Sequence, residues 1–239
     1  MPFKQVRVSP ILDLDQYSNQ NIIFSLTEIP LPAKSACILR NITILNRTTD
    51  VDIDMSLLFL NNNETAIGTV QGASVTLPYI EARDKVLGFV KTAAMFSTAA
   101  ADYDNFILHT TRLAADETGA AVNRLFNGMI LEPESGSRSV YFTALDNAEA
   151  PTYAGATGVL VNGAVSAGAS DTVVVDTVSA LLHFKVGDTV VDADDNVVGV
   201  IKSLTATSIV FESVTGEALA NNEELFTPHS LEFIFDIEY

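Results

Sequence analysis

The chain has 239 residues, of which 30 are acidic and 13 are basic, so its formal net charge is −17. A field of this sign repels phosphate backbones and anionic lipid surfaces, and we therefore expect no nucleic acid and no membrane as a direct partner. The charge favours either solubility by self-repulsion or docking onto a basic protein surface. No apolar run is long enough to span a bilayer, and the opening residues contain no apolar h-region, so we expect no secretory signal.

The first 60 residues are expected to form successive β-strands. Alternating or β-rich runs predict strands at 3–8, 21–29, 37–45 and 51–60, and Pro30 and Pro32 should interrupt pairing after the second. In the fourth strand, Asp50, Asp52 and Asp54 share one face, which is typical of a solvated strand face.

The middle of the chain is less regular. Residues 78–88 have the spacing of one short helix that Gly88 could terminate, and strands are predicted at 125–131 and 139–145. Small residues dominate 93–101 and 114–121, which should be loops.

The C-terminal part contains two distinct β patterns. After a stretch rich in Gly, Ala, Ser and Val at 154–170, four short runs at 171–175, 186–191, 196–201 and 207–211 predict a small closed barrel. The last nine residues alternate strictly, with Leu231, Phe233, Phe235, Ile237 and Tyr239 on one face and mostly acidic residues on the other. Because the small barrel offers no unpaired strand as a partner for this last segment, we expect the segment to pair with the N-terminal strands. The sequence thus predicts an all-β protein: a discontinuous β-sandwich, 1–160 plus 228–239, with an inserted small β-barrel domain at 161–227.

Metal-binding patterns are weak. The run Asp192-Ala193-Asp194-Asp195-Asn196 has acidic spacing, but an EF-hand needs Gly at its sixth position and Glu at its twelfth, where this chain has Val197 and Ser203. The flanking valines instead predict an acidic hairpin tip, with an adventitious calcium site as the alternative. The single cysteine, Cys37, has apolar neighbours and is expected to be a small buried residue.

Catalytic patterns are equally weak. The three histidines, His109, His183 and His229, are far apart in sequence, and the nearest approach to a Gly-x-Ser-x-Gly elbow, around Ser74, lacks the second glycine. Paired carboxylates for glycoside cleavage stay open as an alternative, although the chain has no tryptophan to form a sugar platform. There is no glycine-rich nucleotide motif. We therefore assign no catalytic, cofactor-binding or metal-binding residue.

Several stretches resemble structural proteins of tailed bacteriophages, especially those of marine and cyanobacterial hosts. The opening, Asp13-Leu14-Asp15-Gln16-Tyr17-Ser18 followed by 21–29, resembles that family's Leu-Asp-x-x-x-Tyr … Phe … Thr-Glu-Ile segment. Further similar stretches are 36–45, 55–60, 135–142 and 150–153. In simpler relatives a short apolar strand follows directly, whereas here the barrel region precedes 231–239. That region, with Val186-Gly187-Asp188 and 218–226, is similar to small β-domains of phage tail and surface proteins.

The resemblance implies a jelly-roll-like antiparallel sandwich in a virion protein that is made in the host cytoplasm and has no catalytic residues. It also implies a homo-oligomer, with a trimer favoured. The leading hypothesis is decoration or cementing of a capsid through contacts with the major capsid protein or other virion proteins. The alternatives are a component of the tail, neck or host-binding fibre and, from a different class, a polysaccharide-active β-protein.

Overall fold

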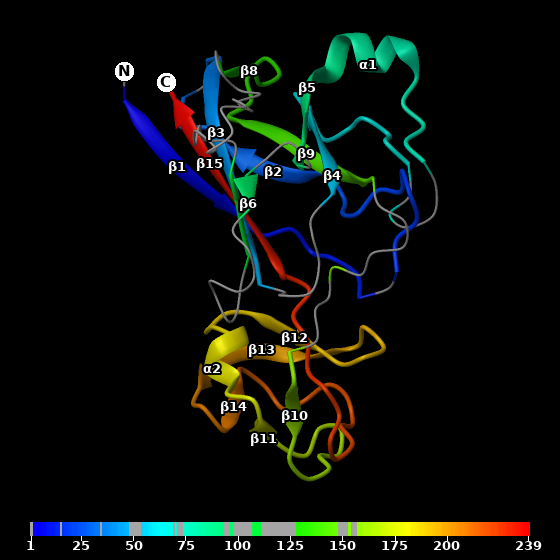
Figure 1. Ribbon diagram of the computed structural model, residues 1–239, viewed down its shortest axis with the longest axis vertical. Helices are drawn as coiled ribbons and strands as arrows, with labels where there is room; N and C mark the ends of the chain where they lie inside the picture. The colour runs from blue at the N-terminus through cyan, green and yellow to red at the C-terminus, as the bar shows by residue number, and fades with distance from the viewer. Residues whose placement is uncertain are drawn as a thin grey trace.

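The structure, a computed structural model, describes residues 2–14, 16–33, 35–47, 54–68, 70, 74–92, 96–97, 107–110, 128–147, 153 and 157–239, with backbone alone at 96–97 and 107–110. The described chain forms antiparallel β-sheets in two bodies, a larger sandwich and a smaller curled sheet beyond one end of it (Figure 1). This arrangement confirms the predicted all-β class.

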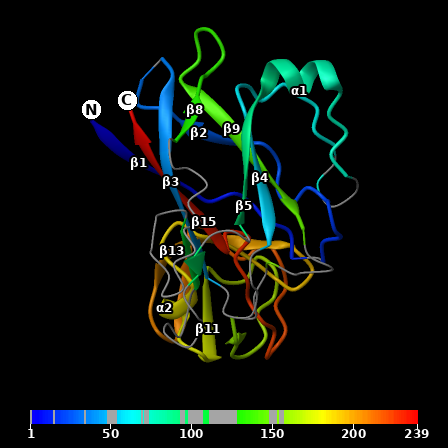
Figure 2. The same ribbon diagram turned by 45° about the horizontal axis from the view of Figure 1, so that its top comes forward.

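Two sheets form the sandwich (Figure 2). The first has the order β1 (Phe3–Val8), β15 (Leu231–Glu238), β3 (Cys37–Asn46), β7 (Ile107–Thr110) and β6 (Phe96–Ser97), and β8 (Met129–Leu131) also pairs with β3. The second has the order β2 (Thr27–Pro30), β9 (Ser139–Asp146), β4 (Met55–Leu60) and β5 (Val86–Lys91).

The strand pairing is that of a jelly roll. Strand β1 pairs with β15, β2 with β9, β3 with β7 and β4 with β5, so these eight strands form one long hairpin that is rolled into two sheets. The further pairs β15–β3 and β9–β4 join the hairpin arms within each sheet. The smaller sheet is inserted in the last connection, between β9 and β15.

The C-terminal strand lies where the sequence predicted, beside strands from the start of the chain. Strand β15 pairs with β1 on one side and with β3 on the other. Its apolar face is fully buried. The alternation also predicts a solvent-exposed acidic face, and this prediction is wrong, because Glu232 and Glu238 are only 7% exposed. Arg7 contacts the Glu232 carboxylate and Arg40 contacts that of Glu238, so neighbouring strands cover these acids with arginine.

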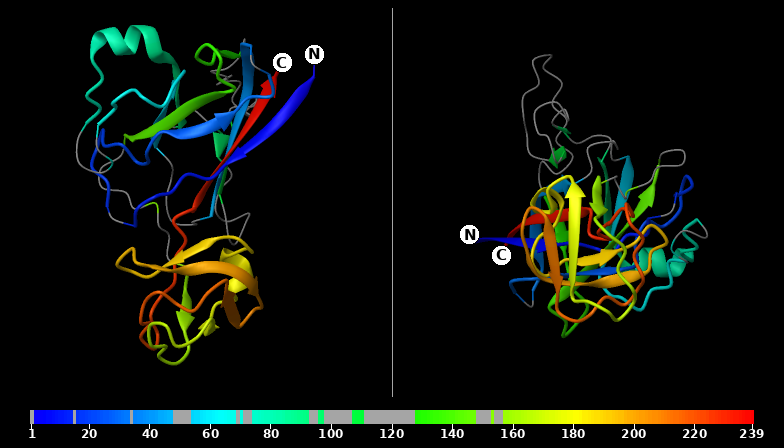
Figure 3. Two further views of the ribbon diagram at one scale, coloured as in Figure 1. Left: turned by 180° about the vertical axis from the view of Figure 1, so that it is seen from behind. Right: turned by 90° about the horizontal axis from the view of Figure 1, so that it is seen from below.

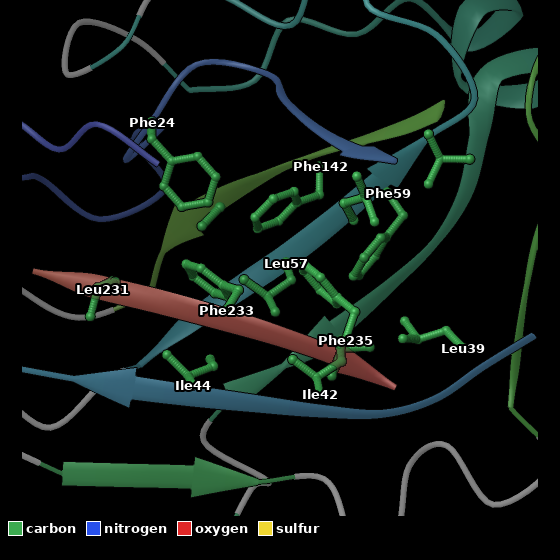
Figure 4. Packing of buried hydrophobic residues seen from close by; sticks show 14 of the residues in the cluster. Phe24, Leu39, Ile42, Ile44, Leu57, Phe59, Phe142, Leu231, Phe233 and Phe235 are labelled. Atoms are coloured by element: carbon green, nitrogen blue, oxygen red, sulfur yellow. The ribbon is translucent and has the colours of Figure 1, made fainter. Parts of the chain in front are cut away.

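An aromatic cluster joins the two sheets. The ring of Phe142 on β9 packs edge-on against Phe233 and Phe235 of β15, with ring centroids 5.0 and 5.1 Å apart. Phe24 and Phe59 extend the cluster on either side (Figure 4). All five rings are fully buried. The cluster therefore links the two layers directly.

Three local predictions need correction. The helix exists as α1 (Tyr79–Lys85), but Gly88 does not terminate it; Gly88 lies in β5, where a Cβ would meet Met129 Cε at 2.9 Å. The strand expected at 21–29 is regular only in β2, because Asn21 and Ile22 form isolated bridges to other segments. The loop expected at 93–101 contains the short strand β6, and the one at 114–121 lies outside the described residues.

Residues 157–227, here called the barrel module, form a curled sheet with its own core. The strand order is β10 (Val159–Val161), β11 (Thr172–Thr177), β14 (Ser208–Phe211), β13 (Val197–Leu204) and β12 (Thr189–Val191), and α2 (Ala180–His183) follows β11. Glu224 bridges to β10 and Phe226 bridges to β12, so one segment ties together the two edges of the sheet. The exact domain boundaries, 161 and 227, stay a prediction.

Replacing Phe233 by alanine tests the aromatic cluster. We expect Phe233→Ala to lower the free energy of unfolding by about 3–5 kcal/mol, because it leaves a cavity between the sheets. Denaturant titration measures this change. Phe89→Ala is the matched control, since that side chain is 65% exposed and its loss should cost less than about 0.5 kcal/mol. Equal effects of the two changes would contradict the account of the core.

The barrel module is expected to fold alone as a 157–227 fragment. Thr157 Oγ1 donates to the Leu225 carbonyl at 2.6 Å, and Gly158 N–H donates to the Glu224 carboxylate at 2.7 Å, so the two ends of the module already meet. Circular dichroism during heating should show a β-sheet spectrum and one cooperative transition. A spectrum of an unfolded chain would show that the module depends on the sandwich.

Candidate functional site

The connection from sandwich to barrel module is held by a buried tyrosine. Tyr153 is 1% exposed, its hydroxyl donates to the Asp146 carboxylate at 2.9 Å, and its carbonyl accepts from Ser230 Oγ at 2.6 Å. Its ring also packs against Tyr17, with centroids 5.5 Å apart. Burial, followed by the neighbouring Asp146 charge, strongly raises the pKa of Tyr153, so the hydroxyl stays a donor. Tyr153 therefore links the connection that leaves the sandwich after β9 to the connection that returns before β15.

The returning connection is fastened to the N-terminal segment. Leu12 N–H donates to the Pro228 carbonyl at 2.8 Å, and His229 Nδ1 lies 3.1 Å from the carbonyl oxygens of both Ser9 and Pro10. Since both neighbours of Nδ1 are acceptors, this nitrogen is the protonated one in the neutral ring. The residues just before β15 are thus held against the segment just after β1.

Ion pairs join the barrel module to the sandwich. Arg47 Nη1 lies 2.8 Å from Asp188 Oδ2, and the side chains are only 14% and 4% exposed. Lys185 Nζ lies 3.6 Å from Glu232, which also accepts from Arg7 at 2.6 Å. The charges alternate along this network, so that each carboxylate is paired with a cation from another segment.

The pKa of Glu232 shows how the charges in this network outweigh the effect of burial. Burial alone would raise the pKa of its carboxyl, but the hydrogen bond from Arg7 and the charges of Lys185 and Arg47 outweigh burial and hold the pKa below the ordinary 4.5. The ionised form is therefore the one that stabilises the folded chain.

A cleft lies between the barrel module and the sandwich. Its volume is about 810 Å³. The sandwich wall is formed by residues 9–13, after β1, and by residues 25–28, at the start of β2. The barrel wall is formed by β12, the β12–β13 hairpin and the start of β13. The lining residues are Ser9, Pro10, Ile11, Leu12, Asp13, Ser25, Leu26, Thr27, Glu28, Val70, Thr189, Val191, Asp195, Val197, Pro228 and His229. This cleft is the candidate site for a ligand or partner.

The acidic run at 192–196 is a hairpin tip, as predicted. Val191 pairs with Val197 across it. Asp192 is buried, and its Oδ1 accepts the N–H groups of Asp194 and Asn196, both at 2.9 Å, while its Oδ2 accepts from the Asn196 side chain at 3.0 Å. Asp195 instead points to the sandwich, where its carboxylate accepts Leu14 N–H at 3.3 Å. The run thus supports the hairpin and one wall of the cleft.

The other candidate residues lie apart. His183 ends α2, where burial lowers the pKa of its imidazole, and His229 lines the cleft; the side chain of His109 lies outside the described residues. Asp54 accepts from the Asn147 amide at 3.2 Å, and Asp50 and Asp52 are also outside the described residues.

Cys37 is buried in β3, as predicted, and burial raises the pKa of its thiol. Among the described residues, no group of three histidine, cysteine or carboxylate side chains could hold a metal ion. No helix in the described part of the chain has the length and apolar character needed to cross a bilayer. No known family model matches the chain, and no curated protein matches it in sequence.

Sequence reasoning did not find the cleft. Its lining residues come from positions far apart in the chain, and they come together only because β15 returns the chain to β1. The available signal was weak: Ile11 and Val197 are apolar residues that each lie two positions from an aspartate, a pattern that also fits an ordinary loop.

The Glu232 network predicts a pH dependence of stability. Because the pKa of Glu232 is lowered in the folded state, its contribution is present above pH 4.5 and is lost as the pH falls below that value. We expect Glu232→Gln to lower the free energy of unfolding by about 1–2 kcal/mol at neutral pH and to make it less sensitive to pH in the acid range. Denaturant titrations across that range measure both effects.

Glu212→Gln is the control for this experiment, since Glu212 is exposed on the barrel module. Parallel stability curves for the wild type and Glu232→Gln at all pH values would contradict the role of the carboxylate.

Proposed function

We propose that the protein is a non-enzymatic structural component of a tailed-bacteriophage virion, which decorates or cements the capsid through protein–protein contacts. The observation that carries the proposal is the jelly-roll sandwich with a barrel module in its last connection. The stretches that resemble phage structural proteins include β4, most of β2 and β3, and the first half of β9, which are framework strands of that sandwich. The resemblance therefore concerns the part of the chain that defines the fold.

The arrangement of the two bodies supports a decorating role. The barrel module lies beyond the end of the sandwich opposite to the two chain termini (Figure 3). A sandwich that sits on a lattice could thus present the barrel module away from its contact face. Since the net charge is −17, the docking surface that fits this protein best is a basic one.

Many shallow contacts would suffice for such a role. A component that binds only the assembled lattice stabilises it by mass action, even when each contact is weak. The side chains of Tyr79, Ile80 and Phe89, on and next to α1, are 80%, 59% and 65% exposed. Exposed apolar groups of this kind are suited to lattice or subunit contacts.

A component of the tail, neck or host-binding fibre is the second candidate. The observation that favours it is an apolar group on the barrel module, where Leu181, Leu182 and Val186 are 57%, 50% and 60% exposed. A recognition or adaptor element could use this group against a partner.

Copy number in purified phage particles distinguishes the two locations. We expect quantitative mass spectrometry of particles from the phage that encodes this chain to find the protein in hundreds of copies, and electron microscopy to find it on the shell lattice. Six or twelve copies on the tail axis would overturn the capsid assignment in favour of the tail. Absence from the particles would overturn the virion proposal as a whole.

A further inference from the structure

The cleft between the sandwich and the barrel module has preformed walls. Asp195 at the hairpin tip accepts Leu14 N–H at 3.3 Å, and Leu12 N–H donates to the Pro228 carbonyl at 2.8 Å. The buried Arg47–Asp188 pair adds a further link between the two bodies. These contacts hold the two walls of the cleft in place before any partner arrives, which lowers the entropy cost of binding.

Apolar side chains at the cleft are open to water. Ile11 on the sandwich wall is 71% exposed, and Val197 on the barrel wall is 57% exposed. A small-molecule site normally covers most of its ligand, whereas these side chains would cover an occupant from one side only. The geometry therefore suits a segment of a larger partner that lies along the cleft.

The charge of the cleft is uniformly negative. Its lining includes the carboxylates of Asp13, Glu28 and Asp195, with acids on both walls, and it includes no lysine or arginine. The whole chain carries a net charge of −17, so the long-range field has the same sign. An occupant with basic side chains is both steered toward the cleft and paired within it.

An outermost strand also begins at this cleft. Strand β2 is the outermost strand of its sheet, and it pairs with β9 alone among the described strands. Its first residues, Thr27 and Glu28, line the cleft together with Ser25 and Leu26. An extended segment is the conformation that can lie beside such an edge and use its main-chain groups.

We propose that this cleft binds an extended segment of a partner protein that combines apolar and basic side chains. The apolar side chains would cover Ile11 and Val197, and the basic ones would pair with Asp13, Glu28 and Asp195. The inference deepens the proposed function and rests on it for the nature of the partner, which would be a virion protein with a basic, apolar arm.

Four fluorescein-labelled octapeptides test the two chemical requirements separately: (Lys-Val)4, (Lys-Ser)4, (Ser-Val)4 and (Glu-Val)4. Fluorescence anisotropy with the full-length protein measures their affinities. We expect (Lys-Val)4 to bind most tightly, the two peptides with one feature each to bind about tenfold more weakly or worse, and (Glu-Val)4 not to bind. Binding of (Lys-Val)4 should weaken as salt is added, because the charges are screened.

A pair of valine substitutions places the binding in the cleft. Val197→Lys should weaken (Lys-Val)4 binding by on the order of tenfold, since it puts a like charge on the cleft wall. Val214→Lys is the matched control, because Val214 is a 50% exposed valine of the same module outside the cleft and the change in net charge is the same. Glu28→Gln and Glu212→Gln form a second pair of the same kind, in which only the first should weaken binding.

Several results would overturn the inference. These are no binding of (Lys-Val)4, binding that falls equally in Val197→Lys and Val214→Lys, or tightest binding by the uncharged (Ser-Val)4. An oligomer that Val197→Lys alone dissociates would also overturn it, because the occupant would then be a second copy of this chain.

The inference and the proposed function can fail independently. If the protein is found in particles but the peptides do not bind, the cleft assignment is wrong and the virion role stands. If (Lys-Val)4 binds in the cleft but the protein is absent from particles, the site stands and the partner is not a virion protein.

Discussion

The pairing of β15 between β1 and β3 is the constraint on which the rest of the structure depends. This last strand brings Phe233 and Phe235 under Phe142, and so it joins the two layers of the sandwich as well as two strands of one layer. It also returns the chain to the N-terminal segment, which places the barrel module against residues 9–14 and forms the cleft. The core, the connection to the barrel module and the candidate site thus all depend on the pairing of β15.

Such a pairing between the two ends of a chain carries a loop-closure cost, because the contacts are very distant in sequence. A barrel module that folds as a unit, as we predict, would reduce that cost. Thr157 contacts Leu225 directly, so the ends of the module are adjacent, and an insertion that folds as a unit acts as a short connection between β9 and β15. Tyr153 and Ser230 then hold the two connecting strands together at the sandwich. This geometry explains how a jelly roll accepts a sizeable insertion in its last connection.

The sequence predicted the parts of the fold in which apolar and polar residues alternate regularly. The alternation at 231–239 identified a strand with one buried face, and the valines around 192–196 identified a hairpin. The burial of Glu232 and Glu238 could not be predicted, because it depends on Arg7 and Arg40 from neighbouring strands. Strand β5 was missed because Gly88 has the local signature of a helix end, while its role is to let β5 pass close to Met129. The cleft was missed because its walls meet only in the folded chain.

The proposed role rests on how these features are arranged. The framework strands include the stretches from which we proposed a phage structural protein, the barrel module is a separate body at the far end, and the acidic cleft lies between them. Most of the contacts that position the cleft are also contacts that position the barrel module, such as those of Asp195 and Pro228. A partner segment in the cleft would therefore add to the contacts that already hold the two bodies together.

Hydrogen exchange of the backbone amides of 231–238 is the most direct test of the central claim. If β15 is paired on both sides, its amides should be protected to the same extent as those of β3, because both lie inside the same sheet. Exchange of 231–238 as fast as that of an exposed chain end, with β3 still protected, would contradict the account.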